Sequence, residues 1–138
     1  MLNEKIVGHV LGFDFGFKHI GVALGNTSLQ RARPLIRLKA QDGIPNWNKI
    51  NELIKEWDIQ AFIVGLPINL DGSNQEVTFA AKKFSRKLAG RFNLPSFLID
   101  ERYTTKEARI SHKNAIEYDT LSAAIIIESW LRAQKKSK

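Results

Sequence analysis

The sequence predicts an α/β fold in which a mixed five-stranded sheet is flanked by helices. Three apolar runs near the start of the chain, at residues 7–15, 20–24 and 34–38, are separated by short connections. Short connections favour antiparallel neighbours, so these runs predict a three-stranded meander. Farther along, segments with helical periodicity alternate with apolar runs at residues 61–64 and 97–99, which is typical of parallel strands joined by helices.

The helices are predicted from apolar residues that recur at steps of three and four. This spacing occurs in residues 47–57, 77–88 and 121–131, and it places the apolar side chains on one face of a helix. Thr104 and Glu107 have the spacing of a capping box, which predicts the start of one more helix between the last two of these segments.

Length and composition indicate one domain. The chain has 138 residues, of which 43% are hydrophobic, enough for one core and too few for two large domains. We expect a single domain over residues 1–138, with a basic flexible tail over about 133–138. There are no cysteines, so disulfides and thiolate metal sites are excluded and the cytoplasm is the expected compartment.

The net charge predicts a polyanionic partner. Lys and Arg total 21 against 14 Asp and Glu, which gives a formal net charge of +7. Nucleic acid is the most common partner of such a basic domain. The apolar stretch after the N-terminus is interrupted by Gly8, His9 and Asp14, which is the pattern of neither a signal peptide nor a membrane span.

Carboxylates at strand ends are the strongest candidates for chemistry. Asp14 ends the first predicted strand, and Asp100 and Glu101 directly follow the fifth. Ligands of open α/β sheets gather where the topology switches, near strand ends. Two carboxylates brought together there would repel each other unless a cation lies between them. Hard oxygen ligands suit Mg²⁺ or Mn²⁺, and two such ions can activate water and stabilise the leaving oxygen of a phosphodiester.

Each of these residues also has a purely structural interpretation. Asp14 could be a turn residue beside Gly16, although an acid within an apolar strand is costly without a partner. Asp119 is the best candidate for a third carboxylate, but Asp at the start of a helix is often only its N-cap. Arg102 either neutralises Asp100 or recognises a phosphate, for which its planar guanidinium is suited.

Basic residues supply candidate phosphate contacts. The basic residues in the helix at 77–88 have an alternative interpretation, in which they only form a solvent-exposed face. The candidates are Lys18, Lys82, Lys83, Arg86 and Arg102.

Three segments together resemble the YqgF family of bacterial proteins. They are GFDFGFKHIGVA at residues 12–23, VGLPINLDGS at 64–73 and DERYTT at 100–105. Members of this family look like Holliday junction resolvases and have an RNase H-like fold. The resemblance covers nearly the whole chain. The chain departs from the family pattern at Lys18-His19, where a Lys-Arg pair is usual, and in the short stretch 109–118 before the final acid.

The resemblance implies a site and an activity. The implied catalytic residues and metal ligands are Asp14, Glu101 and Asp119, the last within YDTLSAA at residues 118–124. The implied activity is nucleolytic maturation of the 5′ end of precursor 16S ribosomal RNA, a step of ribosome biogenesis. The alternative activity is resolution of four-way DNA junctions. The residues do not indicate whether the substrate is RNA or DNA.

Two rival functions differ in what they require. An actin-like or sugar-kinase-like ATPase also places an Asp and glycines after a first strand, but it needs a second domain to close over nucleotide. A non-catalytic nucleic-acid-binding module would bind through the basic surface, and its carboxylates would have no catalytic role. The oligomeric state is open between monomer and homodimer, because matched cuts in a symmetrical junction need two sites and RNA trimming needs one.

Overall fold

A computed structural model describes residues 5–102 and 114–136 of the chain. Its strands are β1 (His9–Asp14), β2 (His19–Asn26), β3 (Arg31–Gln41), β4 (Ile44–Pro45), β5 (Ile59–Leu66) and β6 (Ser96–Asp100). Its helices are α1 (Trp47–Trp57), α2 (Glu76–Phe92) and α4 (Ala115–Lys136). Within the described residues no helix is both long and apolar enough to span a membrane.

The strands form one mixed sheet in the order β4-β3-β2-β1-β5-β6. The pairs β1–β2, β2–β3 and β3–β4 are antiparallel, and the pairs β1–β5 and β5–β6 are parallel. The predicted mixed sheet is therefore confirmed, with a sixth strand added. Asp42 and Gly43, between β3 and β4, both have positive φ (52° and 81°). This is the conformation of a two-residue hairpin, and it returns the chain to form β4.

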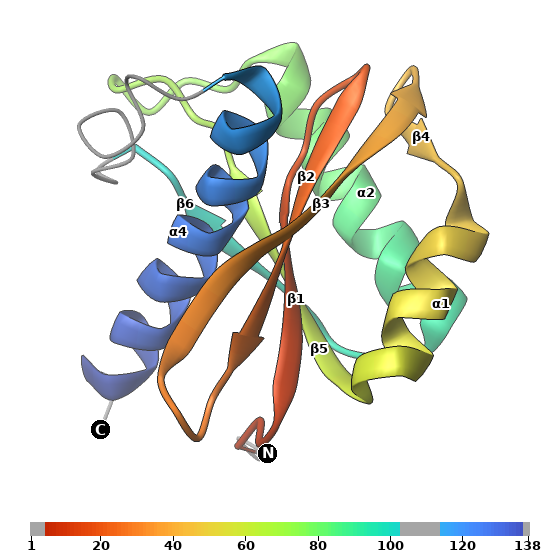
Figure 1. The fold of residues 1–138 in the computed structure, drawn as a ribbon. Coiled ribbons are helices and arrows are strands. Elements are labelled where there is room, and N and C mark those ends of the chain that lie inside the picture. Colours follow the sequence, from red (N-terminus) through yellow and green to blue (C-terminus); the bar gives the residue numbers. More distant parts are fainter. Residues whose placement is uncertain (1–4, 103–113, 137–138) are drawn as a thin grey trace.

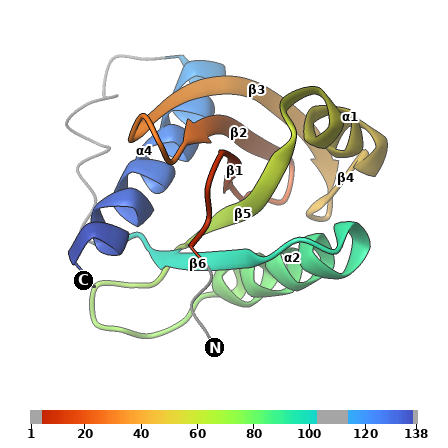
Figure 2. The same ribbon diagram turned by 90° about the horizontal axis from the view of Figure 1, so that it is seen from below.

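The two faces of the sheet are covered by different helices. α1 and α2 pack on one face, and α4 lies across the other, as the two perpendicular views show (Figures 1 and 2). Side chains alternate along each strand, so every central strand contributes to two separate cores. Phe13, Phe62 and Phe84 belong to the core under α1 and α2, whereas Val10 and Ile63 belong to the core under α4.

Glycines let α4 approach the sheet closely. A methyl group built on Gly12 would overlap the side chain of Ile127, and one on Gly25 would lie 2.6 Å from the same side chain. Ile127 itself is completely buried. The space left by the absent side chains is therefore filled by α4, whose position on this face depends on them.

The helices agree with the predicted segments and extend beyond them. α2 covers the predicted 77–88, and α4 covers the predicted 121–131 but begins six residues earlier. α4 also continues to Lys136, so most of the segment predicted to be a flexible tail is helical. The helix predicted from Thr104 and Glu107 lies outside the described residues.

Candidate catalytic site

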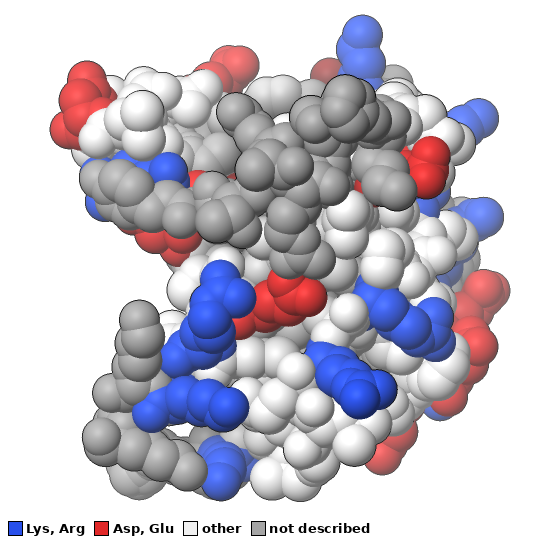
Figure 3. Space-filling model, turned by 60° about the vertical axis from the view of Figure 1, so that its left-hand side comes forward, with Lys and Arg blue, Asp and Glu red and all other residues white. Residues whose placement is uncertain are grey.

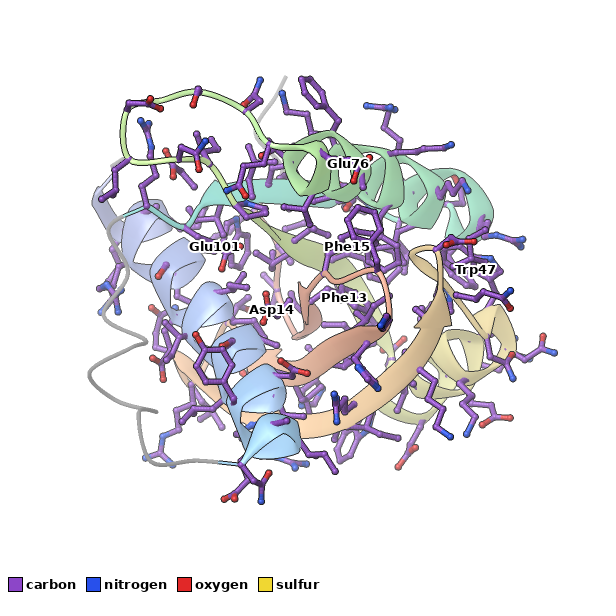
Figure 4. The ribbon with its side chains drawn as sticks, turned by 90° about the horizontal axis from the view of Figure 1, so that it is seen from above. Phe13, Asp14, Phe15, Trp47, Glu76 and Glu101 are labelled. Atoms are coloured by element: carbon purple, nitrogen blue, oxygen red, sulfur yellow. The ribbon has the colours of Figure 1, made fainter. Side chains whose placement is uncertain are left out.

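β1 presents Asp14 to the face of the sheet that α4 covers. Gly12 and Val10, two and four residues earlier, both face α4. Phe13 and Phe15 belong to the opposite core, and alternation along the strand therefore turns Asp14 toward α4. Figure 4 shows Asp14 on the side of α4 and the two phenylalanines directed toward α2.

Glu101 directly follows β6, and its carboxylate lies over Gly65 on β5. A methyl group built on Gly65 would lie 2.6 Å from Glu101 Oε2. Gly65 comes immediately after Val64, which pairs with Phe13, so Gly65 lies beside Asp14. The missing side chain at Gly65 leaves room for the Glu101 carboxylate. The fold thus brings Asp14 and Glu101 to the same face and the same end of the sheet (Figure 4).

α4 carries Asp119 across β2 at Gly21. A methyl group on Gly21 would overlap the backbone carbonyl oxygen of Asp119. Gly21 pairs with Asp14 on one side and with Arg37 on the other. The backbone of Asp119 is therefore next to Asp14, but its side chain turns to β3, where Asp119 Oδ2 lies 2.9 Å from Arg37 Nε.

The structure corrects the predicted place of Asp119 in its helix. α4 begins at Ala115, and the side-chain oxygen of Asn114 accepts a hydrogen bond of 2.9 Å from the amide of Glu117. This is the interaction of an N-cap residue. Asp119 lies more than one turn inside the helix, so its interpretation as the helix cap is wrong.

The arrangement of carboxylates only partly suits a divalent cation. Asp14 and Glu101 supply hard oxygen donors at one end of the sheet, as Mg²⁺ and Mn²⁺ require. No group of three metal-ligating side chains is formed by residues 5–102 and 114–136. The carboxylate of Asp119 is instead held by Arg37. Asp14 and Glu101 are thus the predicted ligands that lie on the same face at this end of the sheet, whereas the carboxylate of Asp119 pairs with Arg37.

Arg102 pairs with Asp100, as its structural interpretation predicts. The Arg102 Nη2–Asp100 Oδ2 distance is 2.7 Å, and Arg102 also donates from Nε and from its backbone amide to the same carboxylate. The hydrogen bond from the Arg102 side chain lowers the pKa of Asp100. Arg102 also contributes to lowering the pKa of Asp71, below the hydrogen bonds from Ser73 in importance. Its predicted contact with a phosphate remains a prediction.

The other predicted phosphate contacts do not share one location. Lys18 is exposed in the turn that follows Asp14, at the carboxylate end of the sheet. Lys82, Lys83 and Arg86 are on α2, on the opposite face of the sheet from Asp14. Lys82 and Arg86 line a shallow recess between α2 and the edge strand β6.

The face of the molecule near α4 combines both signs of charge. Figure 3, in which that side is turned forward, shows a small group of carboxylates between Lys and Arg side chains.

Arg37 is the residue that sequence reasoning missed. It lies in a strand whose exposed positions include several other basic residues, and nothing local marks it. Its pairing with Gly21, and through Gly21 its proximity to Asp14, depends on the register of three strands. The first half of the short segment 109–118 lies outside the described residues, which resume at Asn114.

Comparisons with known proteins identify the family of this chain. Residues 8–133 match the model of a family described as "RuvX: Holliday junction resolvase". A Coxiella burnetii protein named "Putative pre-16S rRNA nuclease" is 47% identical over 141 residues, covering 98% of this chain and 99% of the relative. A Pseudomonas aeruginosa protein with the same name is 47% identical over 139 residues, covering 95% and 96%.

Solved structures show the same fold. RuvC of T. thermophilus, in complex with a Holliday junction substrate, aligns with a TM-score of 0.56 at 15% identity, covering 93% of this chain and 96% of the other. A second structure of Thermus thermophilus RuvC has a TM-score of 0.53. The predicted RNase H-like fold is thereby confirmed. Together with the family match over residues 8–133, these findings show that the chain belongs to the RuvX (YqgF) family of Holliday junction resolvase-like nucleases.

Proposed function

We propose that this nuclease-family member hydrolyses phosphodiester bonds in the 5′-end processing of precursor 16S ribosomal RNA, in the cytoplasm. The placement of Asp14 and Glu101 on one face, beside the side-chain-free position Gly65, carries the proposal. Relatives 47% identical over nearly their full length bear the name of pre-16S rRNA nucleases, which favours this substrate. The basic surface supports a nucleic-acid partner.

Asp14, Glu101 and Asp119 are the proposed catalytic residues and metal ligands. Asp14 and Glu101 hold the cation from β1 and from the end of β6. Asp119 joins them from α4 when its carboxylate leaves Arg37. Bound Mg²⁺ or Mn²⁺, as one ion or two, supplies activation of water and stabilisation of the leaving oxygen. Lys18 and Arg102 lie beside this end of the sheet and are proposed to contact phosphates. The basic residues proposed to contact more distant parts of the substrate are on α2, at Lys82, Lys83 and Arg86.

Resolution of four-way DNA junctions is the second candidate function. It is favoured by the family description and by the alignment with a RuvC bound to a Holliday junction. Two matched cuts in a symmetrical junction require two sites, so this function needs a homodimer. Trimming of one RNA end requires only a monomer.

The two substrates can be compared directly. Purified protein is incubated with precursor 16S ribosomal RNA or with a four-way DNA junction, in Mg²⁺, in Mn²⁺ and in EDTA, with Asp14→Asn as the blank. We expect metal-dependent cleavage of the RNA near its 5′ end that the blank lacks. If the protein cleaves only the DNA junction and sediments as a dimer, junction resolution would be favoured over rRNA processing. Binding without cleavage of either would leave a non-catalytic binding module.

A further inference from the structure

A recess lies beside the carboxylates, between strands β2 and β3 and the start of α4. Its volume is about 410 Å³. Its lining includes His19 from β2, Arg37 and Lys39 from β3, and Ile116 and Thr120 from α4. Arg37 and Lys39 give it a positive charge, and the beginning of α4 adds the positive end of a helix dipole.

The strand register aligns this recess with the catalytic residues. Asp14 pairs with Gly21 and Gly21 pairs with Arg37, so Asp14 and Arg37 are two strands apart in one row. Two strand spacings correspond to about 10 Å between their backbones. His19 pairs with Lys39 two residues farther along the strands, so both lie on the same face of the sheet as Arg37. The basic side chains thus continue the line that begins at Asp14.

Arg37 retains capacity to donate hydrogen bonds. Arg37 Nε is 2.9 Å from Asp119 Oδ2, which makes an ion pair. The same atom is buried and has no aligned hydrogen-bond acceptor among the described residues. The planar guanidinium of Arg37 is well matched to a phosphate, whose oxygens accept two parallel hydrogen bonds.

We infer that this recess binds a backbone phosphate of the nucleic-acid substrate through Arg37 and Lys39, and that the Asp119 carboxylate takes the place of that phosphate on Arg37 until substrate arrives. The inference rests on the proposed nuclease function and adds a substrate contact that also controls Asp119. When a phosphate pairs with Arg37, the carboxylate of Asp119 is released on the side of Asp14. Phosphate binding and the availability of the third ligand are then coupled, and the coupling is reciprocal.

The inference predicts opposite effects of substitutions at the two ends of one ion pair. Binding is measured by fluorescence anisotropy of a labelled single-stranded RNA oligonucleotide in EDTA, so that neither metal nor cleavage contributes. Arg37→Gln should weaken binding about tenfold, because a charge-assisted hydrogen bond to phosphate is lost. It should also make the dependence of RNA affinity on salt concentration shallower, by about the amount that one phosphate contact contributes. Asp119→Asn should strengthen binding about threefold or more, because Arg37 is released.

A double-mutant cycle separates this mechanism from a general effect of charge. The gain from Asp119→Asn should disappear in the Arg37→Gln background, because no guanidinium remains to be released. Lys39→Gln, at an exposed position, should weaken binding even if the Arg37 variant folds poorly. Lys55→Gln on α1, beneath the opposite face of the sheet, is the matched control and should change affinity less than twofold.

The results distinguish failure of this inference from failure of the proposed function. An Asp119→Asn gain that persists unchanged without Arg37, or Arg37 and Lys39 variants equal to the Lys55 control, would overturn the phosphate site. Cleavage by the wild type in Mg²⁺ would show that the proposed function stands in that case. If the double-mutant cycle gives the expected binding effects but the wild type cleaves no nucleic acid, the phosphate site would stand and the nuclease proposal would be rejected.

Discussion

The two faces of the central sheet are built from the same strands and differ sharply in composition. Toward α1 and α2 the sheet presents large aromatic side chains, among them Phe13, Phe15 and Phe62. Toward α4 it presents glycine or alanine at many positions, and the carboxylate of Asp14. The small residues on that face are Gly12, Gly21, Ala23, Gly25, Ala61 and Gly65.

This difference separates stability from chemistry. The aromatic face buries large apolar side chains, which is the main favourable contribution to folding. The face of small residues gives up some of that burial and gains close approach, so that α4 and Glu101 lie directly against backbone at Gly21 and Gly65. Alternation along a single strand, β1, places consecutive residues Phe13 and Asp14 in these two settings.

The largest expected loss of stability comes from the aromatic face. Phe84 is 2% exposed, and its ring lies 5.4 Å from that of Phe13 and 5.2 Å from that of Phe15. Phe84→Ala should reduce the free energy of unfolding by about 3–5 kcal/mol, as for other buried aromatic residues. Urea denaturation measures this loss. Cleavage by the folded fraction should persist, and a folded variant that loses all cleavage would show that the two faces are not separable.

A substitution on the other face should have a smaller effect on stability and a larger one on the site. Gly21→Ala places a methyl group against the carbonyl of Asp119, and it should cost about 1–3 kcal/mol by overpacking. Because α4 must move at Asp119, cleavage should fall more than the population of folded protein does. Unchanged stability together with unchanged cleavage would contradict the close approach of α4.

A glycine in a helix, Gly90, provides the control for this substitution. Gly90 lies in α2, and a methyl group there would have no heavy atom within 4 Å beyond its chain neighbours and the nearby backbone of its own helix. Gly90→Ala should therefore stabilise the protein, by about 0.5–1 kcal/mol, through the higher helix propensity of alanine. Thermal unfolding followed by circular dichroism checks the sign, and a decrease in the midpoint would indicate an unrecognised role for this glycine.

The smallest expected effect is the pH dependence of the Asp100–Arg102 pair at the rim of the site. The pKa of Asp100 is lowered from 3.8 in the folded protein, mainly by the side chain of Arg102. Stability from this pair is thus present above pH 3.8 and is lost as the pH falls through the lower, folded value. The pair is partly exposed, so its contribution should be under about 1 kcal/mol. The difference between wild type and Asp100→Asn in urea denaturation should shrink below pH 3.8, and a difference that grows would contradict the pairing.

Much of the fold could be predicted from the sequence because its signals are local. The apolar runs of β1 and β5 and the periodicity of α1 and α2 depend only on neighbouring residues. β4 was not predicted, because two residues carry no pattern of their own and pair only through the turn at Asp42 and Gly43. The ends of β3 were not predicted, because its outer residues are exposed and charged.

The site was predictable in its residues and not in its geometry. Asp14 and Glu101 could be identified because each directly follows or ends a strand. The ion pair of Asp119 with Arg37 could not, because it joins residues from α4 and β3 that meet only in the folded sheet. For the same reason, nothing local indicated that the basic residues of α2 would lie on the opposite face from Asp14.

The central claim is that the carboxylates on the face of small residues perform metal-dependent hydrolysis. Its most direct test measures RNA cleavage in Mg²⁺ or Mn²⁺ by Asp14→Asn and Glu101→Gln, alongside their RNA affinity and unfolding midpoints. Both variants should fold and bind RNA, and cleavage should fall more than about a hundredfold, because each loses a proposed metal ligand. Full cleavage by either folded variant would contradict the claim.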